Sequence, residues 1–181
     1  MILQRDFYII KKDLGLKVVF SHGKESGPWG GKITKLANLA KELSFDIDSI
    51  DYTGIISPDE RVLKLSNYLE NEPQPYILVG SSMGGYVSLV AAQTNNPLGV
   101  FLLAPALYIP DYPHQTYASH LKRLEIVHGW SDDIIPIEHS IKFAQQTKCS
   151  LHLIDGDHRL NSSIEQVIGL FKSFLQMIKS S

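Results

Sequence analysis

The chain has 181 residues, of which 44% are hydrophobic and 20% are charged, a composition typical of a globular protein that buries a full core. This length predicts a single domain over residues 1–181. The formal net charge of −2 and the lack of a long basic run argue against nucleic-acid binding, and the single cysteine, Cys149, excludes an internal disulfide and a paired-cysteine metal site.

Neither a membrane span nor a secretory signal is expected. No apolar run approaches the ~18 residues that a spanning helix needs. The charged residues Arg5 and Asp6 precede any apolar stretch of signal-peptide length. These features predict a cytoplasmic protein with no membrane partner, and they leave its oligomeric state open.

Strand-like and helix-like segments alternate along the chain. After the Gly-rich segment 24–31, apolar residues recur at helical spacing over 33–43. The next helix has a clear start, because Ser57 can act as N-cap, Pro58 suits the first helical position and Glu60 lies three residues beyond the cap. Strands are predicted over residues 7–11, 16–21, 45–50, 76–80, 98–103, 124–128 and 151–154, and helices over 33–43, 58–69, 85–92, 137–147 and 162–178.

This alternation predicts a mainly parallel sheet with helices on both faces. The central strands are apolar on both faces, as strands are when helices cover each side of the sheet. In such a sheet, ligands bind beyond the carboxyl ends of the strands. Polar groups closely follow four of the strands: His22, Ser82, Asp132 and His158. We therefore expect these four side chains at one edge of the sheet.

Residues 80–84, Gly-Ser-Ser-Met-Gly, are the most informative motif. An apolar strand leads into the motif, and a helix rich in small residues follows it. A serine flanked by glycines in this strand–turn–helix context is typical of a nucleophile elbow, in which a strained turn exposes the hydroxyl of Ser82. The alternative is a glycine–serine turn that only packs.

A serine hydroxyl becomes a strong nucleophile when a base removes its proton, and that base is commonly a histidine held by a carboxylate. Two segments that follow predicted strands supply these groups. Segment 128–136 contains Asp132, and segment 155–159 contains His158. The chain order Ser82, Asp132, His158 is the order of nucleophile, acid and base in folds with a nucleophile elbow.

Together these motifs resemble the α/β-hydrolase fold superfamily, and within it the small YqiA-type group of bacterial esterases. The likeness rests on the elbow 80–85, on His22-Gly23, on segment 128–136 with its pattern HGxxDxxIP, and on Gly156-Asp157-His158. It extends over positions 17 to 158. It implies a three-layer α/β fold with a mainly parallel central sheet, helices on both faces and a minimal cap.

The resemblance places the acid three residues after Gly129, at Asp132. The neighbouring Asp133 is then a solvated turn residue. Asp155 and Asp157 flank the base and shape its loop, and either could supply the carboxylate if Asp132 points away.

Attack on a carbonyl group builds negative charge on its oxygen, and that charge needs preorganised hydrogen-bond donors. The backbone N–H of Met83, the residue after the serine, is one expected donor. By resemblance, the second is the backbone N–H of Lys24, which follows His22-Gly23. His22 and His128 are expected to be structural residues that close their loops through hydrogen bonds.

Segment 104–123 is a short cap or crossover, long enough for a flap but too short for a lid domain. Its Tyr108 and Tyr112 could form the apolar wall of a substrate pocket or could simply pack on the sheet. Trp29 and Trp130 lie beside the oxyanion and acid loops, and could line the pocket or anchor those loops. A short cap suits a small to medium-sized substrate.

We predict neither a metal nor a cofactor. The histidines lack metal-ligand spacing. The Gly-rich stretch has Ser26 where a phosphate-binding GxxxxGK[ST] loop needs glycine, and the elbow has Ser82 where a GxGxxG motif needs its middle glycine.

The favoured function is a serine hydrolase (EC 3.1) that cleaves carboxylic esters or acyl thioesters through a Ser-His-Asp triad and an acyl-enzyme. The expected partner is a small-molecule ester or thioester. Two alternatives stay open, namely a peptidase or amidase on the same scaffold and a non-catalytic, hydrolase-like binding protein.

Overall fold

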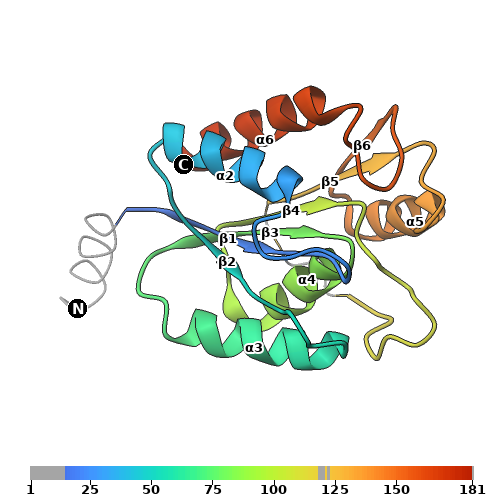
Figure 1. Cartoon of the computed structure of the whole chain (residues 1–181), viewed down its shortest axis with the longest axis horizontal. Coiled ribbons are helices and arrows are strands. Elements are labelled where there is room, and N and C mark those ends of the chain that lie inside the picture. Colours follow the sequence, from blue (N-terminus) through green and yellow to red (C-terminus); the bar gives the residue numbers. More distant parts are fainter. Residues whose placement is uncertain (1–14, 118–120, 122, 181) are drawn as a thin grey trace.

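The computed structural model describes residues 15–117, 121 and 123–180. Within these residues, six strands form one all-parallel sheet in the order β2-β1-β3-β4-β5-β6 (Figure 1). The predicted parallel sheet is confirmed, and the predicted strand 7–11 lies outside the described residues. The strands are β1 (Lys17–Ser21), β2 (Asp46–Ile50), β3 (Tyr76–Ser81), β4 (Gly99–Leu103), β5 (Leu124–Gly129) and β6 (Ser150–Ile154).

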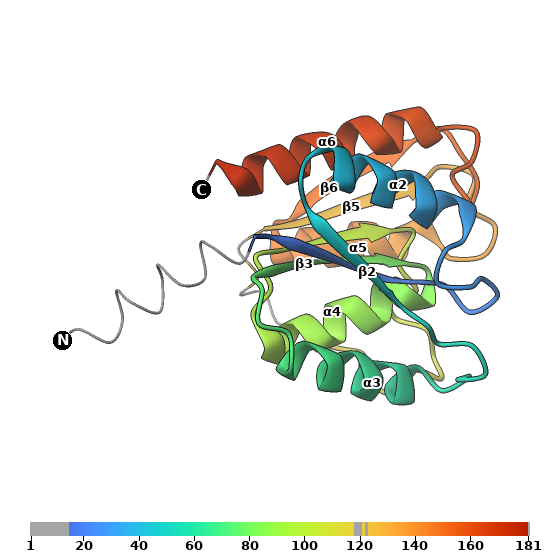
Figure 2. The ribbon, with the colours of Figure 1, turned by 60° about the vertical axis from the view of Figure 1, so that its left-hand side comes forward.

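Helices cover both faces of the sheet. Figure 2 shows α2 and α6 together on one face and α3 and α4 on the other. In the ranges that the structure describes, the helices are α2 (Gly31–Glu42), α3 (Pro58–Glu70), α4 (Met83–Asn95), α5 (Ile137–Thr147) and α6 (Ile164–Lys179). None of these helices has the length and apolar character needed to cross a membrane.

Local sequence signals account for several helix boundaries. Helix α3 starts as predicted, because the Ser57 hydroxyl accepts a hydrogen bond from the Glu60 N–H at 3.3 Å and Pro58 occupies the first helical position. Helix α4 starts at Met83, two residues earlier than predicted, so that Ser82 lies directly at its N-terminus.

The core consists of two layers separated by the sheet, because successive side chains of a strand point to opposite faces. In β4, Phe101 and Leu103 pack in the layer beneath α2 and α6. Val100 and Leu102 pack in the layer beneath α3, α4 and α5. This is the predicted three-layer arrangement.

The order of the strands determines where a ligand can bind. From the central pair β1 and β3, the chain continues to β2 on one side and to β4 on the other. The carboxyl ends of β1 and β3 therefore lie at the point where the strand order reverses, which is where open α/β sheets form a crevice for ligands. His22 directly follows β1, and Ser82 directly follows β3.

Candidate active site

Ser82 occupies a strained turn between β3 and α4. Its φ of 55° and ψ of −121° lie in a region that residues with a Cβ rarely adopt. Hydrogen bonds to residues on both sides of the turn hold Ser82 in this conformation. The Ser82 N–H donates to the Leu103 carbonyl at 3.0 Å, and the Ser82 carbonyl accepts from the N–H groups of Ala106 and Gly85, both at 2.9 Å. The backbone thus holds the Ser82 side chain clear of the sheet, as the elbow motif predicts.

The flanking glycines allow β1, β3 and α4 to approach closely. A Cβ at Gly84 would lie 2.0 Å from the carbonyl oxygen of Ser21, and a Cβ at Gly80 would lie 2.2 Å from the carbonyl oxygen of Gly84. Both obstacles are backbone atoms, which cannot turn aside as a flexible side chain can. Only glycine therefore fits at positions 80 and 84, because neither has room for a Cβ.

Gly84→Ala is expected to lower the free energy of unfolding by about 3 kcal/mol or more, because β1 or α4 must shift to admit the methyl group. This corresponds to a loss of roughly 6–12 °C in Tm. The matched control is Gly169→Ala, a helical position where a Cβ meets nothing within 4 Å. The control is expected to raise stability by up to about 1 kcal/mol. Chemical denaturation followed by circular dichroism measures both variants, and equal small effects would contradict the close approach.

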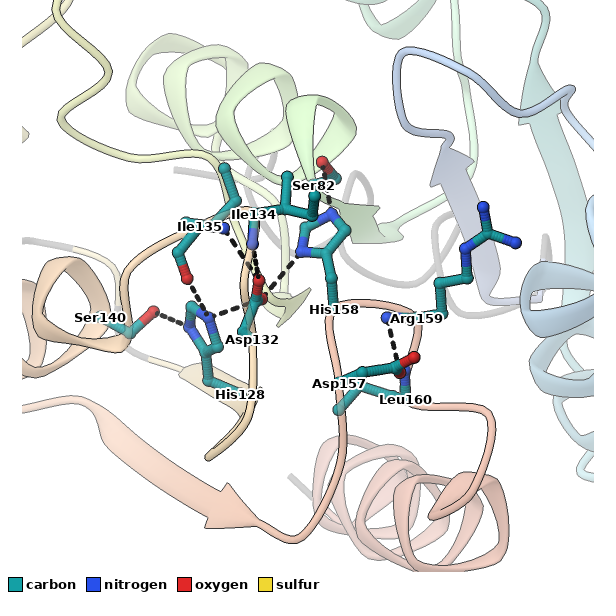
Figure 3. Close-up of polar contacts among 10 residues, drawn as sticks. All are labelled: Ser82, His128, Asp132, Ile134, Ile135, Ser140, Asp157, His158, Arg159 and Leu160. Carbon is teal, nitrogen blue, oxygen red and sulfur yellow. Dashed lines mark hydrogen bonds and ion pairs between the residues drawn. The ribbon is translucent and has the colours of Figure 1, made fainter.

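The structure brings Ser82, His158 and Asp132 into one hydrogen-bonded series (Figure 3). His158 Nε2 lies 3.0 Å from Ser82 Oγ, and His158 Nδ1 lies 2.8 Å from Asp132 Oδ2. A carboxylate can only accept, so Nδ1 carries the proton and Nε2 is free to accept from the serine hydroxyl. Residues separated by 76 and 26 positions in the sequence thus form a chain of proton donors and acceptors.

Asp132 is the carboxylate that contacts the histidine. Its side chain is fully buried, and its Oδ1 accepts hydrogen bonds from the N–H groups of Ile134 at 2.9 Å and Ile135 at 2.8 Å. Burial alone would raise the pKa of Asp132, but these N–H groups and His158 hold it below its ordinary value, so that the side chain is ionised. The neighbouring Asp133 is exposed.

The other two acidic residues near the base do not contact its ring. Asp157 Oδ1 accepts hydrogen bonds from the N–H groups of Arg159 at 3.0 Å and Leu160 at 2.9 Å, and so turns the loop after the base. The Asp155 carbonyl accepts a hydrogen bond from the Ser163 hydroxyl. Both residues shape the loop that carries His158, in agreement with the predicted role.

Met83 and Lys24, whose backbone N–H groups are predicted to form an oxyanion hole, lie shortly after the ends of β3 and β1. Met83 follows Ser82 at the start of α4, and Gly23 is so close that a Cβ there would lie 3.4 Å from the Ser82 Cβ. Over the described ranges, the N–H groups of Met83 and Lys24 donate to no protein acceptor. Both N–H groups are therefore free of protein acceptors in those ranges, and their role in an oxyanion hole stays a prediction.

A buried arginine, which the sequence analysis missed, supports the loop after β1. Arg61, only 2% exposed, donates from Nη1 to the Gly23 carbonyl at 3.2 Å and lies over the Tyr52 ring. His22 Nδ1 donates to the same carbonyl at 2.8 Å, while its Nε2 accepts from the Tyr52 N–H. His22 is thus the structural residue that was predicted. The signal for Arg61 was its spacing, four residues before the buried Leu65 on α3.

The tyrosines of segment 104–117 pack against helices. The Tyr112 ring lies 4.7 Å from that of Tyr86, and the Tyr108 ring lies 5.4 Å from that of Tyr117. The Tyr108 hydroxyl donates to Gln146 on α5 at 2.8 Å. Packing therefore explains the positions of the Tyr108 and Tyr112 side chains. A role for them in substrate binding stays a prediction.

The two tryptophans are more exposed. Trp29 is 48% exposed and Trp130 is 59% exposed, in the loops that follow β1 and β5. Trp130 lines an open cleft of about 330 Å³ beside the acid loop, together with Ile134 and Glu138. Across the ranges that the structure describes, no group of three or more potential metal ligands is found.

No protein-family model matches the chain, and no curated protein matches its sequence. Solved structures do match. A protein from Xanthomonas campestris pv. campestris, described as a hydrolase of the alpha/beta superfamily, is 28% identical with a TM-score of 0.80, covering 90% of this chain and 99% of its own. Est1E from Butyrivibrio proteoclasticus is 18% identical with a TM-score of 0.74, covering 92% and 89%. A serine hydrolase without a lid from Xanthomonas campestris is 17% identical with a TM-score of 0.67, covering 90% and 81%.

At 18% and 17% identity, Est1E and the serine hydrolase without a lid show that this chain has the same fold. The narrower likeness to the YqiA-type group stays a prediction. By its parallel sheet, its elbow and its structural neighbours, the chain belongs to the α/β-hydrolase superfamily.

Proposed function

We propose that the protein is a serine hydrolase that cleaves carboxylic esters or acyl thioesters, with Ser82 as nucleophile, His158 as general base and acid, and Asp132 as the residue that orients His158. The observation that carries the proposal is the 3.0 Å separation of Ser82 Oγ and His158 Nε2, with Asp132 on the other ring nitrogen. A nucleophile and a base within hydrogen-bond reach, and a third group orienting the base, are what covalent acyl transfer requires.

In the proposed reaction, Ser82 Oγ attacks the carbonyl carbon while its proton moves to His158 Nε2. The negative charge on the carbonyl oxygen is stabilised by the backbone N–H groups of Met83 and Lys24. When the intermediate collapses, His158 returns the proton to the leaving alcohol or thiol, and the acyl group stays on Ser82. Water then attacks the acyl-enzyme with His158 as base, which releases the carboxylic acid and restores the serine.

The nature of the substrate is inferred from the surroundings of Ser82 and from one neighbour. The cap segment between β4 and β5 is short, which suits a small to medium-sized substrate. Est1E, one of the similar structures, was also solved with ferulic acid bound. Ferulic acid is a carboxylic acid, the class of product that ester hydrolysis releases.

Matched substrates test the reaction class. For a p-nitrophenyl ester, an acyl thioester and a p-nitroanilide of the same acyl group, we expect turnover of the ester or the thioester and none of the anilide, whose amine is a poor leaving group. Release of p-nitrophenol, of thiol and of p-nitroaniline is followed at matched concentrations. Faster anilide turnover would make the protein an amidase, whereas inactivity on all three together with no labelling by a fluorophosphonate would favour a binding protein.

A further inference from the structure

The carboxylate of Asp132 has a second histidine partner, His128, for which the proposed reaction has no use. His128 lies near the end of β5, and its side chain and that of Asp132 are both fully buried. Its Nε2 lies 2.9 Å from Asp132 Oδ2 and 3.1 Å from the Ile135 carbonyl oxygen, and its Nδ1 lies 2.7 Å from the Ser140 hydroxyl on α5. Figure 3 shows this group on the side of Asp132 opposite His158.

The partners of His128 determine which of its nitrogens carries hydrogen. A carboxylate and a backbone carbonyl can only accept, so Nε2 must be the donor to both. The Ser140 hydroxyl can donate, and it supplies the hydrogen that Nδ1 needs. Burial lowers the pKa of His128 more than the Asp132 carboxylate raises it, so the ring is neutral at pH 7. The neutral tautomer satisfies every polar atom of this buried group.

We propose that His128 is a positioning residue of the site: its Nε2–H, fixed from behind by the Ser140 hydroxyl, holds the Asp132 carboxylate in the orientation in which Oδ2 faces His158 Nδ1. This inference rests on the proposed function, in which Asp132 orients the general base. Its physical basis is that Oδ2 has two donors, which come from opposite sides and fix it in place.

The neutrality of His128 matters for the reaction. His158 becomes positively charged when it takes the serine proton, and a cation at His128 would oppose that charge. A neutral donor instead orients and solvates the carboxylate without repelling the imidazolium. The charged and titratable groups around His128 and Asp132 are His158 and Lys32. Burial lowers the pKa of Lys32 to about 8, against the opposing effect of Asp132 and Asp157.

Removing the His128 donor should have two effects. The Asp132 carboxylate becomes free to rotate, so kcat/KM falls by about 10–100-fold. This is the usual loss when a residue that orients a functional side chain through a hydrogen bond is removed. The contact between Asp132 and His158 changes as well, so the acidic limb of the kcat/KM profile, which reports the free enzyme's base, shifts from that of the wild type.

The experiment compares variants of His128 and Ser140 with two controls over the pH profile of ester hydrolysis. His128→Leu removes both nitrogens, whereas His128→Gln can keep an N–H near the position of Nε2 and is expected to recover most of the lost activity. Ser140→Ala removes the hydroxyl behind the ring and is expected to lower kcat/KM roughly 3–10-fold. The matched control is His152→Leu, because His152 pairs with Glu125 at 2.9 Å on the neighbouring strand and touches no residue of the site. Its profile should equal that of the wild type.

A shifted acidic limb in His128→Leu and Ser140→Ala, with recovery in His128→Gln, supports the positioning role. If His128→Leu lowers stability but leaves kcat/KM and the limb unchanged, the residue is only structural and the proposal is overturned. If His128→Leu does not fold, Ser140→Ala decides, and a wild-type profile in that variant overturns the proposal. Ser82→Ala in the same series separates the two ideas, because an active Ser82→Ala contradicts the proposed nucleophile, whereas an inactive Ser82→Ala with a wild-type profile in His128→Leu contradicts the positioning role alone.

Discussion

Ser82→Ala is expected to lower kcat for ester hydrolysis by about 10⁴–10⁶-fold and to abolish labelling by a fluorophosphonate. The variant loses the only atom that can form the acyl-enzyme in the proposed reaction, while His158 and Asp132 keep their own contact. Alanine has the same backbone preferences as serine at this φ of 55°, so the fold should be retained. Initial rates and mass-spectrometric detection of the probe adduct measure the loss.

The matched control is Ser88→Ala, the same change six residues further along the chain, within α4. The Ser88 hydroxyl is fully buried and has no hydrogen-bond partner among the described residues, so its removal should leave kcat unchanged and raise the free energy of unfolding by about 1 kcal/mol. If Ser82→Ala keeps wild-type turnover or is labelled as strongly as the wild type, the nucleophile is a different residue.

Asp132→Asn is expected to lower kcat by about 10⁴-fold, whereas Asp133→Asn should stay within a few-fold of the wild type. The surroundings of Asp132 explain the size of the effect. The N–H groups of Ile134 and Ile135 both donate to Oδ1, so an asparagine must place its oxygen there and its NH₂ at the position of Oδ2. That NH₂ would face His158 Nδ1 and favour the tautomer with hydrogen on Nε2, which cannot accept the serine proton.

Steady-state kinetics on one ester compare these two asparagine variants directly. The exposed Asp133 is a fair control, because it carries the same charge one position along the chain. Loss of activity in Asp133→Asn with an active Asp132→Asn would reverse the assignment. Equal small effects would mean that no carboxylate of this loop orients the base.

The ionised Asp132 also predicts how stability depends on pH. Because its pKa in the folded protein lies below the ordinary 3.8, the folded state binds fewer protons than the unfolded state near that pH. Its contribution to stability is complete above about pH 3.8 and is lost as the pH falls through the lower, folded value. The stability difference between wild type and Asp132→Asn should therefore change below that pH and remain constant just above it.

Much of the architecture could be predicted from local signals. Apolar strands alternating with amphipathic helices predict a covered parallel sheet, and the Ser57 cap with Pro58 predicts the start of α3. The elbow motif predicts a strained Ser82 followed by a helix, and the observed φ and ψ agree. These features depend on a few neighbouring residues, whose sterics and hydrogen bonds act over short distances along the chain.

Other features depended on the packing of remote segments. Nothing near Arg61 indicates that its guanidinium reaches the loop after β1, because its acceptors in that loop, the carbonyls of His22 and Gly23, lie 39 and 38 positions away. His128 closes its own loop as expected, through Asp132 and the Ile135 carbonyl, but only the approach of α5 shows that its Nδ1 also binds Ser140. The tyrosines of the cap segment could not be assigned, because an aromatic side chain suits both a pocket wall and a packed helix.

The sequence by itself determined the strand–turn–helix around Ser82, the order of the candidate nucleophile, acid and base, and the parallel character of the sheet, because periodicity and turn chemistry are properties of adjacent residues. Only the tertiary structure decided that Asp132 rather than Asp133 faces His158, and which groups surround that carboxylate. The reason is geometric: neighbours in a loop point in different directions, and a hydrogen bond forms only within about 3 Å, a distance set by the order of β3, β4, β5 and β6 across the sheet.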